Sequence, residues 1–517
     1  MPNRSADTLF QLIHTLEKSE KRSFKLYIKR NSANEDLKTI QLFDALEKMT
    51  EYDEIVLLKK VPSIPKRQLA NSKAHLYREI LSSLRLLTTE NHISIQLNAQ
   101  LDYARILYNK GLYHQSLKIL ERIKEIARPY NQYSLLVHVL STEKKIETLH
   151  ITRSMQDRAE QLALESEEII GKVKMIAELS SLALELYSWY IKNGHARNEE
   201  DEIGVRKFFK EKLPANANEQ TGFYERLYLY QCYCWYAFIR QDFLMYYRYT
   251  KKWVDIFKEE PLMLGPEPAQ YIKGLHNLLN AHFDLRNFEA FRITLKEFED
   301  FAATSVANKD FNNQVLIFVY LTTARLNQHF MEGTFKDGLS LVPYIEDKLE
   351  EYTVFLDRHR ILVFYYKIAT VYFGSGDYST CIDYLQKIIN WNVDLRNDLQ
   401  CYARLLHLIA HYELGNYEII EHLIKSVYRF MAKMGNLTVV EEEIFRFLKA
   451  TAHISPRKMQ PEFEKLLSKI KKLEKNRFET RAFAYLDIIS WLESKVYNKP
   501  LSVIVHEKFK AHKERKY

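Results

Sequence analysis

The chain has 517 residues, more than a typical single domain, and a net charge of +8. Its 46% hydrophobic and 27% charged residues exclude a disordered chain. Only 13 glycines and 12 prolines occur. Because glycine supplies tight turns and phosphate-binding loops, this composition excludes a turn-rich fold and predicts long helices joined by short polar turns.

The first ninety residues are predicted to form a basic helical domain. Prolines 62 and 65 interrupt it, because proline breaks a helix interior. The stretch from Lys18 to Leu87 contains fifteen Lys and Arg residues and nine Asp and Glu residues. The predicted helices span about residues 6–18, 19–30, 36–49, 53–60 and 66–87.

The last of these helices resembles the third helix of a helix-turn-helix unit. It would present basic side chains to phosphates or bases. Their spacings do not place them on one helical face, and the acidic residues 51–54 precede them. DNA contact therefore stays an alternative hypothesis. The basic residues are Arg67, Lys73, Arg78 and Arg85.

Helical hairpins recur through the middle of the chain. The clearest unit, residues 365–389, reads as a helix, a turn at Gly376 and a second helix, with apolar residues at i, i+3, i+4 and i+7. Residues 402–425 and 101–127 repeat this pattern around Gly415 and Gly111. Weaker copies of the turn occur at 241–243, 286–288 and 332–335.

This pattern resembles a tetratricopeptide repeat. The residues that carry the resemblance are Tyr365, Ile368, Ala369, Tyr372, Gly376, Tyr378, Cys381, Leu385 and Ile388. The resemblance covers about residues 91–450 and implies an all-α, right-handed superhelical array of antiparallel helix hairpins. From 241 onward the turns recur at steps in the forties, shortening to 39, whereas the family period is about 34 residues. We therefore expect longer helices or linkers. The opening segment also resembles the start of large helical proteins common in Bacteroidota, which implies no function.

The tetratricopeptide resemblance implies a concave groove lined by the first helix of each unit, in which a peptide or a partner helix would bind. In the three best units this groove would include Asn98, Leu101, Val363 and Ile409. The residues predicted to contact the partner are Arg105, Tyr108, Tyr366, Lys367, Thr370, Phe373, Tyr402, Leu405 and Tyr412.

The last segment, residues 455–517, is predicted to form a second basic cap. It contains sixteen Lys and Arg residues against eight Asp and Glu residues. Helices are expected over about 461–475 and 479–496, before a break at 498–500 and a frayed Lys- and Arg-rich stretch from His506 to Tyr517. The predicted organisation is a domain at 1–90, a repeat array at 91–454 and a cap at 455–517.

The sequence contains few residues in patterns that carry chemistry. It has no GxxxxGK[ST], GxGxxG, G-x-S-x-G or HExxH motif. His407 and His411 lie one helical turn apart with Glu413 nearby, but we interpret them as packing residues. Cys232 and Cys234 point to different faces of a helix and cannot hold one metal. We predict no catalytic residue, metal or cofactor.

An aromatic block occupies residues 223–257, with Arg and Lys residues between the rings. Such a surface can stack bases or bind a peptide, although burial inside two hairpins is the preferred interpretation.

The predicted function is a non-enzymatic scaffold for protein–protein interaction, with a nucleic-acid-associated factor that uses its basic ends as the alternative. The unpatterned cysteines, the absence of a signal-like start and the short apolar runs predict a cytoplasmic protein without a membrane segment. The sequence identifies neither the partner nor the oligomeric state.

Overall fold

Every regular element that the structure describes is a helix. None of these helices combines the length and the hydropathy that a membrane crossing requires. The structure is a computed structural model that describes residues 7–30, 36–88, 92–150, 157–391, 397–435, 437–451, 456–474, 476, 478–479 and 486–514.

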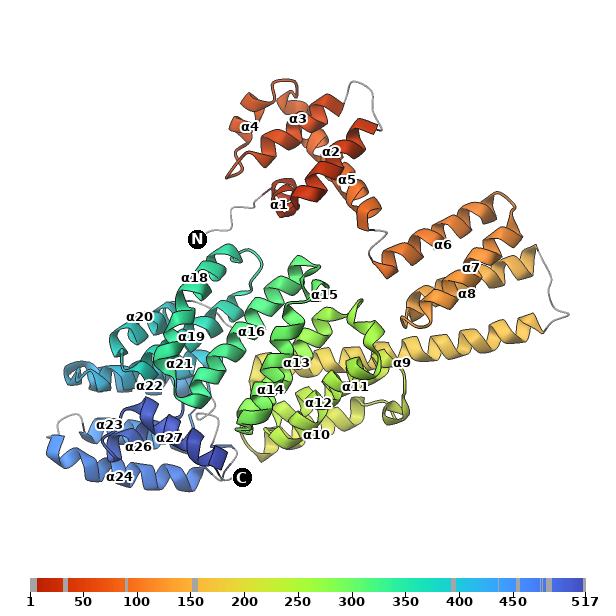
Figure 1. Cartoon of the computed structure of the whole chain (residues 1–517). Coiled ribbons are helices and arrows are strands. Elements are labelled where there is room, and N and C mark those ends of the chain that lie inside the picture. Colours follow the sequence, from red (N-terminus) through yellow and green to blue (C-terminus); the bar gives the residue numbers. More distant parts are fainter. Residues whose placement is uncertain are drawn as a thin grey trace. The chain divides into compact units, whose positions relative to one another are not determined.

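The chain divides into two compact units, Met1–Ile170 and Gly171–Tyr517 (Figure 1). The long helix α9 (Arg158–Asn193) begins in the first unit and ends in the second. The other helices of the first unit are α1 (Thr8–Thr15), α2 (Lys18–Arg30), α3 (Asp36–Glu47), α4 (Glu54–Lys60), α5 (Lys66–Thr88), α6 (Ile93–Asn109), α7 (Tyr113–Ala127) and α8 (Tyr133–Leu149).

Helices α1 to α5 share a core of their own, in which Leu9, Phe24, Phe43 and Leu76 are fully buried. Asp7 caps α1 by accepting from the N–H groups of Leu9 and Phe10, as expected for a residue at a helix start. The predicted break at prolines 62 and 65 separates α4 from α5. The helical character predicted for this segment is therefore confirmed for the part that the structure describes.

The second unit consists of helices packed mainly against their neighbours in sequence. They are α10 (Glu199–Lys212), α11 (Phe223–Ile239), α12 (Phe243–Glu259), α13 (Pro268–Asp284), α14 (Phe288–Ala302), α15 (Ser305–Asn308), α16 (Phe311–Glu332), α17 (Phe335–Gly338), α18 (Val342–Glu351), α19 (Arg358–Ser375), α20 (Tyr378–Ile389), α21 (Asn397–Glu413), α22 (Tyr417–Lys433), α23 (Val439–Thr451), α24 (Pro456–Leu473), α26 (Ile488–Val496) and α27 (Leu501–Glu514).

Successive hairpins of this unit contact one another in two ways: the second helix packs on the next first helix, as α12 on α13 and α20 on α21, and first helices also pack on one another. Helix α13 packs on α16, α16 on α19, and α19 on α21, while α12, α14, α20 and α22 are second helices. Burial is continuous along this series: one core extends from α11 to α16 and the next from α16 to α26. The first helices are therefore covered on several sides. Only the side chains on their uncovered faces can contact a partner.

The six predicted hairpin turns share one backbone conformation. Gly111, Gln241, Arg286, Gly333, Gly376 and Gly415 all have a positive φ. The N–H of the next residue donates to the carbonyl five residues earlier, as from Asp377 to Tyr372 at 3.0 Å and from Asn287 to His282 at 2.8 Å. The predicted turn positions are confirmed.

Short extra elements explain the long period. The segment Pro261–Leu264 forms a 3₁₀ turn between α12 and α13, and α15 lies between α14 and α16. After Gly333 the second helix is divided into α17, a 3₁₀ turn at Leu339–Leu341, and α18. The expected longer linkers are thus present as added helical turns.

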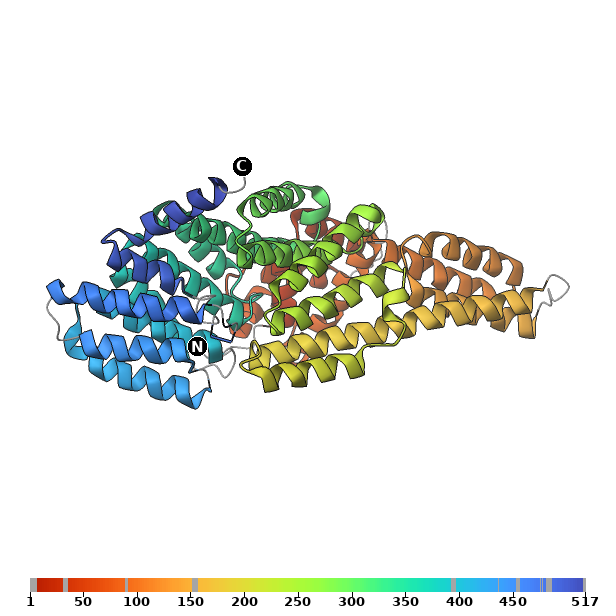
Figure 2. The same cartoon turned by 90° about the horizontal axis from the view of Figure 1, so that it is seen from below.

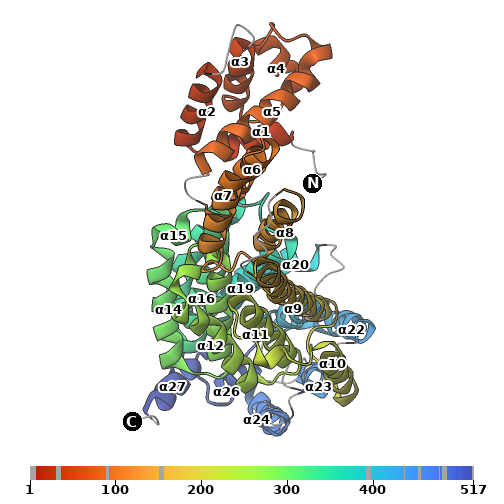
Figure 3. The same cartoon turned by 90° about the vertical axis from the view of Figure 1, so that its right-hand side faces the viewer.

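The C-terminal helices belong to the second unit, and α27 returns to its middle. Helix α27 packs on α16 and α19, and the Phe509 ring lies 4.9 Å from that of Phe288 on α14 (Figures 2 and 3). His506 Nδ1 lies 2.9 Å from the carbonyl oxygen of Glu332. A Cβ on Gly333 would lie 2.6 Å from the carbonyl oxygen of Ser502, so only glycine fits this contact.

Two predicted helix boundaries differ from the structure. Helix α24 begins at Pro456 and contains Pro461, whereas its start was predicted at 461. The helix predicted over 479–496 is described only as α26, because residues 480–485 lie outside the described residues. The final residues 515–517 of the predicted basic tail also lie outside them.

Candidate functional site

A stripe of polar side chains runs along α13, a helix that is otherwise buried in apolar surroundings. Its members recur at i, i+3, i+7, i+10 and i+14, which is one face of a helix. Tyr271, Ile272 and Leu275, on the remaining faces, pack into the core. The stripe consists of Gln270, Lys273, Asn277, Asn280 and Asp284.

Lys273 is half-buried without a carboxylate partner. Its ammonium lies 5.7 Å from the centre of the Tyr187 ring and 5.9 Å from that of the Trp235 ring. It makes no hydrogen bond and no ion pair within the described residues. Burial lowers the pKa of this lysine, and the charge of Arg360 acts in the same direction.

His276 lies one turn further along α13 and stacks on Tyr320 of α16, with 4.1 Å between ring centres. Asn280 Nδ2 lies 3.0 Å from His276 Nε2 and can only donate there, so the ring proton resides on Nδ1. Nδ1 is buried and has no hydrogen-bond partner. Burial, together with the charges of Lys367, Lys273 and Arg360, lowers the pKa of His276 to about 3, so the ring is neutral.

Arg360 and Lys367 come from the first and third turns of α19. The Arg360 guanidinium lies 5.9 Å from the centre of the Tyr320 ring and 3.6 Å from Asp357, a residue at the exposed start of the same helix. Burial raises the pKa of Tyr320, and Arg360 opposes this rise. Tyr320 therefore lies between the imidazole of α13 and the guanidinium of α19.

Lys367 donates to the buried side-chain oxygen of Asn327 at 2.6 Å and lies 5.4 Å from the centre of the Phe330 ring. Burial lowers its pKa to about 8, against the opposing charge of Asp284. Burial also raises the pKa of Asp284 to about 7, so this carboxyl compensates the lysine only in part.

We call Lys273, Arg360 and Lys367 the basic cluster. All three charges act on His276, and that of Arg360 also acts on Lys273, across α13 and α19. Facing them are aromatic rings, a neutral amide, the exposed carboxylate of Asp357 at 3.6 Å from Arg360, and the Asp284 carboxyl, whose pKa burial raises to about 7. Unpaired charge is costly to hold away from water, so a partly buried cluster of this kind marks a candidate binding site.

The structure corrects most of the predicted groove in this unit. Five of the predicted contact residues are at most 6% exposed because their helices are covered by the neighbouring hairpins and by α26 and α27. Leu101 and Ile409 are buried as well, whereas Val363 is half-buried. The five are core residues: Tyr366, Phe373, Tyr402, Leu405 and Tyr412.

Lys367 and Thr370 are half-buried, and Lys367 belongs to the basic cluster. In the first unit Arg105 is exposed and pairs with Asp102 at 3.3 Å, and Asn98 is exposed. Tyr108 is half-buried, with its hydroxyl 3.1 Å from His150. The prediction therefore reached only the α19 part of the site.

The sequence interpretation missed Lys273, His276, Tyr320 and Arg360. A signal was present, because Lys273 and Tyr320 each lie thirteen residues before the left-handed residue of their own turn, Arg286 and Gly333. Alignment on the weak turns would have placed these two side chains on one face. The other positions depend on helix packing that the turns alone do not specify.

The histidine pair on α21 is half-buried. The rings of His407 and His411 are 4.5 Å apart, and burial lowers the pKa of His407 to about 4. Glu413 faces away from them and accepts from Trp491 Nε1 at 2.6 Å. No group of three potential ligands able to hold a metal occurs among the described residues.

The aromatic block forms α11 and α12 and is mostly core. The two faces of α11 enter two different cores, with Cys232 in one and Cys234 in the other. Burial raises the pKa of both thiols. Arg226 pairs with Glu259 at 2.6 Å, so this cation is paired within the chain. The preferred interpretation as packing is supported.

The basic residues of α5 do not act together. Lys73 points inward, where it pairs with Asp7 and donates to the Tyr52 hydroxyl at 2.9 Å. Arg67 and Arg78 are exposed on α5. The arrangement lacks the single basic face that phosphate contact requires.

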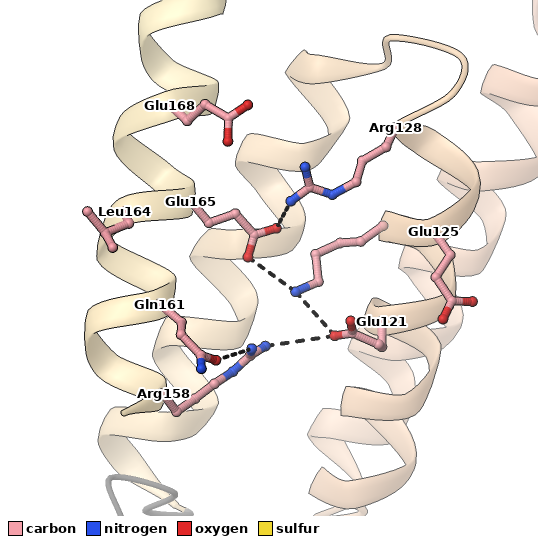
Figure 4. A pocket seen from close by; sticks show the side chains of 9 residues that line it. Glu121, Glu125, Arg128, Arg158, Gln161, Leu164, Glu165 and Glu168 are labelled. Atoms are coloured by element: carbon pink, nitrogen blue, oxygen red, sulfur yellow. Dashed lines mark hydrogen bonds and ion pairs between the residues drawn. The ribbon is translucent and has the colours of Figure 1, made fainter. Parts of the chain in front are cut away.

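The first unit contains a hollow of about 430 Å³ between α7 and α9 (Figure 4). Lys124 lies 3.0 Å from Glu143, 3.2 Å from Glu121 and 3.4 Å from Glu165. Arg158 also pairs with Glu143, whose pKa is lowered by these two cations against the effect of burial. Each of the three cations of this hollow, Lys124, Arg128 and Arg158, therefore has a carboxylate partner within the protein.

The fold defines an all-helical protein of packed hairpins with a polar site on α13, α16 and α19. No protein-family model matches the chain, and no curated protein matches it either.

Proposed function

We propose that this protein is a non-enzymatic scaffold that binds a segment of a protein partner along the polar stripe of the second unit. The observation that carries the proposal is the half-buried stripe on α13, continued by Asn327 on α16 and Lys367 on α19. Gln270 and Asn277 accept hydrogen bonds within the chain, from Gln231 at 2.9 Å and from Tyr246 at 3.3 Å. Lys273 has no such partner among the described residues, and a partly buried charge of this kind adds no stability to the helix. Binding of a partner would supply the contacts that it lacks.

The superhelical arrangement is part of the same proposal. The succession of contacts from α13 through α16 and α19 to α21 supports a stack of hairpins with the first helices on its inner side. In such a stack the stripe faces the concave surface, where an extended segment meets several units at once.

A photocrosslinking experiment tests the proposal. The photoreactive residue p-benzoylphenylalanine is introduced at Thr370 or at Asn280, and separately at Lys296, which is exposed on α14. Asn280, in the stripe, and Thr370, three residues after Lys367 on α19, are expected to crosslink one protein partner in cells, and Lys296 is not. Equal crosslinking from Lys296, or none from the stripe, would contradict the proposal.

The nucleic-acid alternative is less favoured because many basic side chains near the ends pair within the chain. Lys471 and Lys508 both contact Glu493, at 2.7 and 2.6 Å, and Lys25 contacts Asp44 at 2.8 Å. Retention of RNA or DNA that falls steeply as salt rises would favour the alternative over the scaffold.

A further inference from the structure

The basic cluster and the neighbouring His276 offer hydrogen-bond donors with few matching acceptors. Lys273 has only aromatic rings around its ammonium, and Lys367 has one neutral amide oxygen. Nδ1–H of His276 is a buried donor without a partner. Buried donors are normally satisfied, so a set of unsatisfied donors and cations indicates that the missing group is an anion.

The spacing of the cations suits an extended chain with several acidic groups. Arg360 and Lys367 are seven residues apart on α19, which is about 10 Å along a helix axis. An extended peptide covers this distance in about three residues at its usual rise per residue. Lys273 adds a third contact from α13, so one small anion would not reach all three cations.

The aromatic rings of the site already contact side chains of the protein. The rings of Tyr187 and Trp235 face Lys273, and that of Tyr320 stacks on His276. Single-stranded nucleic acids bind by stacking bases on free rings. The contacts therefore favour a peptide over a nucleic acid.

We propose that Lys273, Arg360 and Lys367 bind the carboxylates of an acidic, extended segment of a protein partner. This inference rests on the proposed function and specifies the chemistry of its partner. The carboxylates would accept from the cations as charge-assisted hydrogen bonds.

The test uses the full chain and a fluorescein-labelled peptide of alternating Glu and Ser, with a Gln and Ser peptide as the neutral counterpart. Anisotropy is expected to show saturable binding of the acidic peptide that weakens as salt rises. Lys273→Met and Lys367→Met are each expected to weaken binding about tenfold, the effect of losing one charge-assisted hydrogen bond.

The matched control is Lys296→Met, which removes an exposed lysine paired with Asp300 at 2.7 Å on α14. It is expected to leave the affinity unchanged. Equal losses in Lys296→Met and Lys273→Met would overturn the inference, as would failure of the acidic peptide to bind at low salt. Competition by inorganic phosphate as effective as that by the peptide would also overturn it, because a small anion would then suffice.

Two further readouts separate the outcomes. Thermal unfolding of Lys273→Met and Lys367→Met should occur at a temperature no lower than that of the unchanged chain, which excludes misfolding as the cause of lost binding. If the crosslinked partner segment is neutral, and the neutral peptide binds as well as the acidic one, the scaffold proposal stands and the inference about acidic residues falls.

Discussion

The two units hold buried charge in opposite ways. In the first unit Lys124 and Arg158 share Glu143, and two further carboxylates complete the network. In the second unit Lys273 faces rings, and Lys367 faces an amide. In the first arrangement each cation has a carboxylate partner within the protein, whereas in the proposed binding mode the second gains its counter-charge from the partner segment. Buried charge therefore indicates a binding site where its counter-charge is absent.

The largest effect is expected from Glu143→Gln in the first unit. The substitution leaves Lys124 and Arg158 without their shared carboxylate, and breaking a buried pair in this way costs about 3 kcal/mol of unfolding free energy. Hydrogen exchange in α7 and α8 measures it. Glu125→Gln, an exposed residue of the same hollow, should change stability by no more than about 0.5 kcal/mol. Equal losses of unfolding free energy in Glu143→Gln and Glu125→Gln would show that Glu143 does not neutralise buried charge in the first unit.

A pair of lysine substitutions compares the units directly. Lys124→Met should cost about 2 kcal/mol because Glu143 and Glu165 lose a partner. Lys273→Met should cost nothing or stabilise by up to about 1 kcal/mol, because an unpaired charge is replaced by an apolar chain. Denaturant titration measures both, with tryptophan fluorescence reporting the second unit, which holds all five tryptophans. A similar loss from both lysines would show that Lys273 has a structural partner.

The units should also respond oppositely to pH. The folded pKa of Glu143 lies below its usual 4.5, so its contribution is present above 4.5 and is lost as pH falls through the folded value. The folded pKa of Asp284 is raised to about 7, so its contribution is present below 3.8 and is lost as pH rises through about 7. Lys367, which acts on Asp284, stays charged over this range.

Denaturant midpoints from tryptophan fluorescence, measured from pH 4 to pH 7, test this. The unchanged chain should lose stability in the second unit as pH rises, and Asp284→Asn should flatten that dependence. Glu143→Gln should leave it intact. A flat profile in the unchanged chain would show that Asp284 is ionised throughout.

The smallest change in stability is expected from a substitution at the Arg286 turn, which tests turn geometry separately from the basic cluster. Arg286 holds a left-handed conformation, with φ 52°, and its side chain makes one exposed contact of 3.8 Å with Asp487. Arg286→Gly should stabilise the second unit by about 0.5 kcal/mol, because glycine adopts this conformation without strain. It also removes a cation outside the basic cluster, so peptide affinity should not change. A loss of affinity would mean that net charge, and not the cluster, attracts the peptide.

The sequence predicted the hairpins because their turns have a local cause. A left-handed residue followed by a helix-starting residue specifies each turn, and the six positions from Gly111 to Gly415 needed no knowledge of packing. The groove was harder. Helix α19 carries large apolar side chains on nearly every face, so its periodicity does not show which face the neighbours leave open. Tyr366 was predicted to contact a partner and is buried, while the adjacent Lys367 is on the site.

The basic cluster could not be predicted from the sequence for a different reason. Its members come from α13 and α19, and only the packing of both on α16 brings them together around Tyr320. A lysine on a helical pattern is normally a solvated residue. The distance of Lys273 from its turn indicates which face of the helix it lies on, but no local feature shows that its ammonium lacks a counter-charge. The absence of a counter-charge is a property of the folded neighbourhood.

The close contact at Gly333 has a consequence for the last helix. A methyl group there would collide with the backbone of α27 at Ser502 and His506, residues that are distant in the sequence. The absence of a side chain at position 333 thus allows α27 to pack against the end of α16. Gly333→Ala should therefore displace α27 from α16 without any change in the sequence of α27. This variant would show which surface of the second unit α27 covers.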